Sequence, residues 1–128
     1  MRGFAVMVLL FAIFLMGCGD DGTSSDTSDG EVENPSFSQH IQPILNANCA
    51  LAGCHGGSSP VADYSLTSYA GMLGNGTDST PNVVSGKSSE SFLYQRVESG
   101  AMPPGATRLE AKDVVTIKNW IDQGTQDN

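Results

Sequence analysis

A shortage of apolar side chains is the feature that most constrains how this chain can fold. Residues 34–128 contain only 34 apolar side chains among 95 residues, and many Gly and Ser residues are interspersed among them. A domain this small gains little from burial, so a core this thin is marginal for an unaided fold. We therefore expect a further group to fill the middle of the domain.

The start of the chain is typical of a bacterial lipoprotein signal. Met1 and Arg2 are followed by an uninterrupted apolar run over residues 4–16. As a helix this run spans about 20 Å, less than the roughly 30 Å hydrocarbon core of a membrane, so we interpret it as a signal peptide rather than a retained anchor helix. Leu15-Met16-Gly17-Cys18 resembles the lipobox of bacterial lipoproteins. The resemblance implies that residues 1–17 are removed and that Cys18 carries the lipid anchor.

An acidic segment separates the lipobox from the domain. Between positions 19 and 33 the chain has six acidic residues, no basic residue and one apolar residue, Val32. Such a segment cannot bury enough surface to offset its chain entropy, so residues 18–33 are predicted to be a disordered tether. As a flexible coil it reaches on the order of 20–25 Å. A solvated spacer is our preferred interpretation and an acidic docking tail is the alternative.

The length and charge exclude several classes of function. With 128 residues, 6 basic and 14 acidic side chains and a formal net charge of −8, the chain has room for one ordinary domain and no basic face for phosphates. We therefore expect no nucleic-acid partner.

Hydrophobic periodicity over residues 34–128 predicts helices and no strand. The pattern indicates a first helix that begins at Ser36, short helices over 67–73 and 88–98, and a last helix over about 110–123, joined by long loops. Gln39 is expected to complete a capping box with Ser36, and Pro43 is expected to kink or restart the first helix.

The last helix is expected to pack through one apolar stripe. Val114, Ile117 and Ile121 share a helical face, with Trp120 flanking them and Gly124 at the position after the C-cap. The domain is therefore predicted to be all-α, with three to five helices.

Directly after the first helix stands Cys49-Ala50-Leu51-Ala52-Gly53-Cys54-His55. Two thiols followed by an imidazole are what covalent haem attachment requires, because each sulfur adds to a vinyl group and the next ring nitrogen reaches the iron. The usual motif has two residues between the cysteines, whereas this one has four. The small residues of the insert allow it to loop out. Cys49, Cys54 and His55 are therefore candidates to hold one haem c.

A haem iron held by His55 needs a sixth ligand or an open site. After the signal the candidates are His40, Met72 and Met102. Met102 is preferred because Pro103 and Pro104 stiffen the loop that would hold its thioether. Met72 lies at an apolar helical position typical of a core, and a hydrogen-bonded or solvated role is preferred for His40.

The order of motifs over residues 34–128 resembles the small single-haem class I c-type cytochromes, in particular the planctomycete-type cytochrome c domain. The resemblance rests on these segments: Phe37, Ile41-Gln42-Pro43-Ile44-Leu45, Cys49, Cys54-His55-Gly56-Gly57, Leu66, Ser68-Tyr69, Leu73, Val83-Val84-Ser85-Gly86, Ser91, Leu93-Tyr94, Val97, Gly100-Ala101-Met102-Pro103-Pro104, Ile117, Trp120-Ile121 and Gly124. It implies terminal helices that cross over a buried haem, His55 and Met102 as the two iron ligands, and electron transfer. Ser85, where the family is expected to have proline, and Glu110, at a position expected to hold a Ser or Thr helix cap, depart from its pattern.

Read as a cytochrome, the chain is an electron carrier rather than an enzyme. The implied partners are redox proteins of the cell envelope, with the membrane reached through the lipid on Cys18. Gly19 after Cys18 favours the outer membrane by the same resemblance, so the domain is expected to face the periplasm or the cell surface.

Three other interpretations use the same residues. Cys49 and Cys54 could form a disulfide in a lipoprotein interaction module without haem. Displacement of Met102 would open the iron to small ligands and give peroxidase-like activity. A zinc site would need Cys49, Cys54 and His55 together with His40, in an unfamiliar order.

Overall fold

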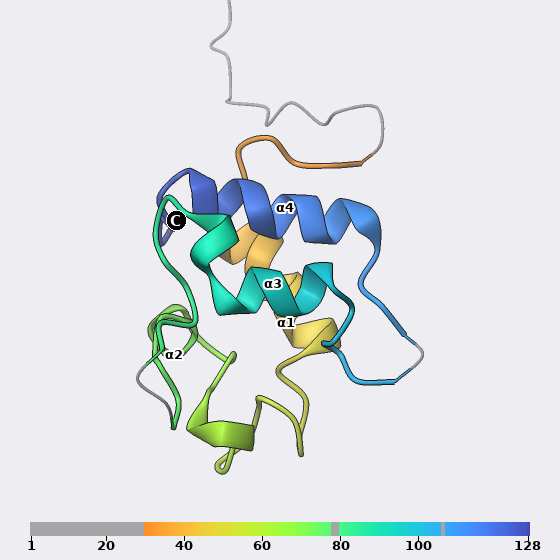
Figure 1. Cartoon of the computed structure of the whole chain (residues 1–128), viewed down its shortest axis with the longest axis vertical. Helices are drawn as coiled ribbons and strands as arrows, with labels where there is room; N and C mark the ends of the chain where they lie inside the picture. The colour runs from red at the N-terminus through yellow and green to blue at the C-terminus, as the bar shows by residue number, and fades with distance from the viewer. Residues whose placement is uncertain (1–29, 78–79, 106) are drawn as a thin grey trace, which may run out of the picture.

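The computed structural model describes residues 30–77, 80–105 and 107–128. The signal peptide, Cys18 and nearly all of the predicted tether lie outside these ranges. In the described part the chain forms helices and long loops with no strand, which confirms the predicted all-α class (Figure 1). No described helix has the length and apolar character needed to cross a membrane.

Seven helical segments follow one another in the described residues, and in Figure 1 the last of them lies alongside the one before it. They are the π-helical turn η1 (Phe37–Ile41), α1 (Gln42–Asn48), the 3-10 turn η2 (Val61–Asp63), α2 (Tyr69–Met72), the 3-10 turn η3 (Ser88–Glu90), α3 (Phe92–Glu98) and α4 (Ala111–Asp122).

The first helix begins and breaks where its sequence predicts. The Ser36 hydroxyl accepts a hydrogen bond from the Gln39 N–H at 3.5 Å, so Ser36 is the N-cap. The predicted capping box is wrong in one of its two hydrogen bonds. The Ser36 N–H donates to Nδ1 of His40 at 2.9 Å and not to the Gln39 side chain. Pro43 has no N–H to donate to the preceding turn, and that turn widens to η1 before α1 restarts with Pro43 near its N-terminus.

The segment predicted as one helix over 88–98 is two helices divided at Ser91. The Ser91 side chain is fully buried, accepts from the Val84 N–H at 2.8 Å and donates to the Lys87 carbonyl at 2.9 Å. These bonds close a loop that the Gly86 N–H also ties to the Ile121 carbonyl of α4 at 2.8 Å. Ser85 therefore lies in a loop whose neighbouring residues, Val84 and Gly86, are both held by hydrogen bonds.

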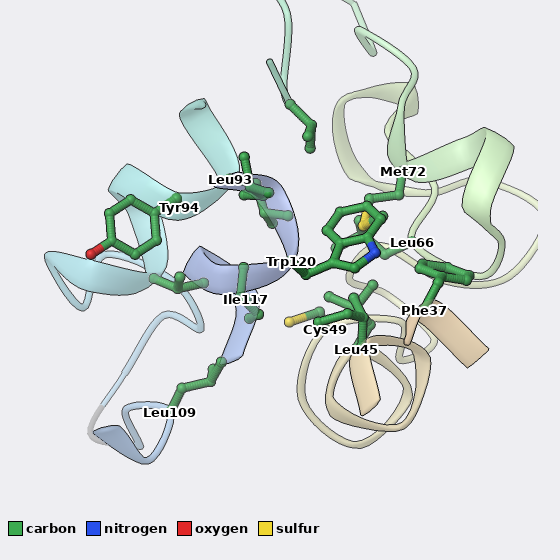
Figure 2. Close-up of a cluster of buried hydrophobic side chains, with 14 of the residues drawn as sticks. Phe37, Leu45, Cys49, Leu66, Met72, Leu93, Tyr94, Leu109, Ile117 and Trp120 are labelled. Atoms are coloured by element: carbon green, nitrogen blue, oxygen red, sulfur yellow. The ribbon is translucent and has the colours of Figure 1, made fainter. Parts of the chain in front are cut away.

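The core lies where η1, α1 and α4 meet, with Trp120 at its centre rather than at its edge (Figure 2). Trp120 is 1% exposed, its ring centroid is 5.7 Å from that of Phe37, and Ile117 and Ile121 are fully buried. The crossing of the first and last helices predicted from the family resemblance is thus built from one aromatic pair and its aliphatic neighbours.

The segment before the predicted domain boundary packs on α4. Val32 is buried, its carbonyl accepts from Nδ2 of Asn119 at 3.0 Å, and its N–H donates to the Thr116 hydroxyl at 3.4 Å. Nε2 of Gln123 donates to the Glu33 carbonyl. The last two residues of the predicted tether, Val32 and Glu33, therefore contact α4.

Candidate cofactor site

A cavity of about 340 Å³ opens between the cysteine loop and the loop after α3. Cys49, Cys54, His55 and Met102 all line it, although Met102 is 47 residues from His55 in the sequence. The other lining side chains are mostly apolar, and the volume lies in the range of cofactor and ligand sites. The structure thus brings the four predicted site residues to one place.

The cysteine loop is a tight turn fixed by its own backbone. The His55 N–H donates to the Cys49 carbonyl at 3.0 Å, which spans the whole insert between the two thiols. A Cβ at Gly56 would lie 2.2 Å from the Ala50 carbonyl oxygen, so only glycine fits after His55. Leu51 in the insert is 46% exposed. The insert of Ala, Leu, Ala and Gly therefore loops outward, as expected from its sequence.

The His55 ring is oriented by a backbone carbonyl. Nδ1 of His55 lies 2.9 Å from the Tyr64 carbonyl oxygen, and because a carbonyl only accepts, Nδ1 carries the proton. In the neutral imidazole this leaves the Nε2 lone pair free for a metal. The Tyr64 ring meets the His55 ring edge-on at 5.5 Å and its hydroxyl donates to the Met72 carbonyl, so the carbonyl that holds His55 is itself anchored.

Met102 sits in a loop attached to α3. Its N–H donates to the Arg96 carbonyl at 3.0 Å, and Gly100 reverses the chain with φ +74°. A Cβ at Gly100 would lie within 2.2 Å of the Arg108 guanidinium, which packs across this glycine and donates to the Ser99 carbonyl at 2.7 Å. The half-buried thioether is thus presented to the cavity by a loop that is bonded at both ends.

The two thiols of the cavity differ in their surroundings. Cys49 is 7% exposed and belongs to the core cluster beside Leu45 (Figure 2), whereas Cys54 is half-buried. Burial, and secondarily the charge of Cys54, raises the pKa of the Cys49 thiol to about 11. Neither thiol is in a disulfide.

The competing iron ligands lie elsewhere. Met72 is fully buried in the core beside Trp120 (Figure 2), and Nδ1 of His40 accepts from the Ser36 N–H. Neither residue lines the cavity. Over the described ranges no group of three or more His, Cys, Asp or Glu side chains is placed to hold a metal ion.

Sequence reasoning missed Tyr64, Asn82 and Arg96, which also line the cavity. Tyr64 orients His55 through its backbone carbonyl, and no sequence pattern identifies a backbone carbonyl in such a role. Asn82 is buried and ties the segment after α2 to α3, because its Nδ2 donates to the Gly74 carbonyl and its backbone carbonyl accepts from the Leu93 N–H. Arg96 could have been found from its spacing of four residues after Phe92, which places the two side chains on one helical face.

The chemistry of the lining fits a haem. The cavity combines an apolar wall, two free thiols, an imidazole whose Nε2 is free and a thioether, which are the groups that a c-type haem uses. A small all-α domain with this cavity between its loops has the architecture of a cytochrome c domain.

Comparison with known proteins supports the same class. Residues 52–105 match the family model described as Planctomycete cytochrome C, and this segment includes Cys54, His55 and Met102. This match supports a planctomycete-type cytochrome c domain, a family that implies haem binding. Cys49, η1, α1 and α4 lie outside the matched segment. No curated protein and no solved structure matches the chain significantly.

Proposed function

We propose that the chain is a membrane-tethered c-type cytochrome that carries single electrons between proteins of the cell envelope. The convergence of Cys49, Cys54, His55 and Met102 on one cavity is the observation that carries this proposal. One haem c, attached through the two cysteines, would supply a one-electron Fe(III)/Fe(II) couple there.

His55 is proposed as the proximal ligand. The Tyr64 carbonyl holds the proton of His55 on Nδ1, so the ring stays neutral and in one orientation when Nε2 binds a metal. A ligand that does not reorient keeps the geometry of the site the same in both oxidation states, which suits electron transfer.

Met102 is proposed as the distal ligand. Its thioether is a soft donor that favours the reduced metal and raises the reduction potential relative to a second imidazole. The lining is mostly apolar, and the described part of it offers no carboxylate to serve as a general acid or base. We therefore propose a carrier without turnover of its own. A peroxidase-like reaction would require displacement of Met102.

The ligand assignment is tested with a matched pair of methionine variants. Met102→Leu is expected to abolish the weak far-red sulfur-to-iron absorption band of the oxidised protein, because Met102 lines the cavity. Met72→Leu keeps a similar volume in the fully buried core and is expected to retain the band. A band that survives in Met102→Leu and disappears in Met72→Leu would assign the ligand to Met72 instead.

The tether is proposed to place the domain at a lipid surface, with the outer membrane favoured. Cys18 lies outside the described residues, so this part rests on the lipobox resemblance. Replacement of Cys18 by Ser is expected to move the protein from the membrane fraction to the soluble fraction, because the anchor consists of acyl chains on that sulfur. A Cys18→Ser protein that still sediments with membranes would refute the anchor.

A further inference from the structure

Arg96 is the one permanently charged side chain among the described residues that line the cavity. It extends from α3, and its guanidinium carbon lies 4.3 Å from the centroid of the Phe92 ring, which lines the same cavity. Stacking on an aromatic face restrains a guanidinium without using its N–H donors.

These donors have no partner in the described part of the chain. The guanidinium of Arg96 forms no ion pair and donates no hydrogen bond to any described residue, whereas Arg108 donates to the Ser99 carbonyl at 2.7 Å. On α3 the nearby carboxylate of Glu98 accepts from the Tyr94 hydroxyl at 2.8 Å. A stacked, solvent-exposed cation at the edge of a mostly apolar cavity suits a planar carboxylate, which its N–H donors can bind bidentately.

We propose that Arg96 binds a carboxylate of the ring held in this cavity and thereby favours the reduced iron. The inference rests on the proposed haem site, since a haem is an apolar ring with carboxylate side chains and the described lining offers no other permanent cation. An ion pair with Arg96 offsets the negative charge of the ring's carboxylate, which would otherwise stabilise the oxidised, more positive iron. Arg96 is therefore a positioning residue that acts on the potential through the ring.

Lys87 provides the control. It carries the same charge, but its ammonium pairs with Glu90 at the surface and its side chain does not line the cavity. If only the overall charge of the domain mattered, Arg96→Gln and Lys87→Gln would change the potential equally.

The first test measures the midpoint potential of the haem-loaded protein and its two glutamine variants. Arg96→Gln is expected to lower the equilibrium constant for reduction on the order of tenfold, about 59 mV for one electron, whereas Lys87→Gln changes it less than twofold. Arg96→Lys keeps the charge and is expected to restore most of the loss. Equal shifts in Arg96→Gln and Lys87→Gln, or no shift in either, would overturn the proposal.

The second test identifies the carboxylate and does not depend on covalent loading. The haem-free full-length chain is titrated with iron protoporphyrin IX and with its dimethyl ester, in which the carboxylates are blocked. The wild-type chain is expected to bind the free acid several-fold more tightly than the ester, and Arg96→Gln is expected to lose this preference. Haem binding with no preference in the wild-type chain overturns the role of Arg96 alone, whereas a wild-type chain that binds no haem overturns the proposed function as well.

Discussion

At the scale of single residues, the environment of each site group follows from one or two neighbours. The Tyr64 carbonyl decides which nitrogen of His55 carries the proton, and burial decides how readily the Cys49 thiol ionises. The thiols of one motif therefore differ in reactivity, because Cys54 is half-buried and Cys49 belongs to the core.

This difference predicts how the haem-free chain reacts with an alkylating agent. The thiolate is the reactive form, and a pKa of about 11 leaves roughly a hundredfold less thiolate at pH 8 than the ordinary value of 9.0. We expect Cys54 to be alkylated first at pH 8, and the rate at Cys49 to rise as the pH increases toward 11. Peptide mass spectrometry over a pH series measures both rates. Faster labelling of Cys49 at pH 8 would contradict the burial described here.

The candidate site residues were predictable from sequence where a short motif carries them. Cys49, Cys54 and His55 lie together, and Met102 stands in a proline-stiffened loop. The cavity brings all four together, while their roles as ligands and attachment points stay predictions. The Tyr64 carbonyl and Arg96 were not predictable in the same way. The carbonyl is a backbone group, which every residue has, and Arg96 is a candidate only because its side chain lines the cavity.

At the scale of helices, the ends are decided by capping and by proline. Ser36 caps the first helix and Pro43 restarts it, as periodicity and backbone chemistry predict. The break at Ser91 was missed because it is caused by a buried hydroxyl, which bonds to the Val84 N–H and the Lys87 carbonyl of the preceding loop. Helix positions are thus predictable from hydrophobic periodicity, whereas an interruption made by side-chain hydrogen bonds to a loop is not.

The N-terminus of α4 offers a test of capping. Glu110 has the extended backbone of an N-cap, φ −63° and ψ 147°, but its side chain makes no capping hydrogen bond and pairs with Lys112 at the surface. Glu110→Asp keeps the negative charge and shortens the side chain to cap length, so we expect it to raise the free energy of unfolding by about 0.5–1 kcal/mol.

Urea denaturation compares Glu110→Asp with the wild-type protein. Glu110→Ala is the control, because it removes both the charge and any cap, and the exposed pair with Lys112 contributes little. Glu110→Ala is expected to be slightly less stable than wild type. Equal stability of the Asp and Ala variants would mean that this end of α4 gains nothing from a cap.

At the scale of the whole molecule, the thin core and the cavity have one explanation. Trp120 and its neighbours pack the helices against one another on one side, while the wall formed by Cys49, His55 and Met102 encloses a space of about 340 Å³. The apolar side chains that the sequence lacks are those that would otherwise fill this space. A bound ring would therefore complete the interior that composition alone left incomplete.

Intact mass spectrometry of the purified protein under denaturing conditions tests the covalent attachment of one haem. The protein is produced with a c-type haem maturation system, together with a Cys49→Ala/Cys54→Ala double variant as the control. The wild-type chain is expected to retain the mass and colour of one haem after denaturation, whereas the double variant is expected to release its colour to acidified solvent. A wild-type chain that has the mass of the polypeptide alone would refute covalent attachment.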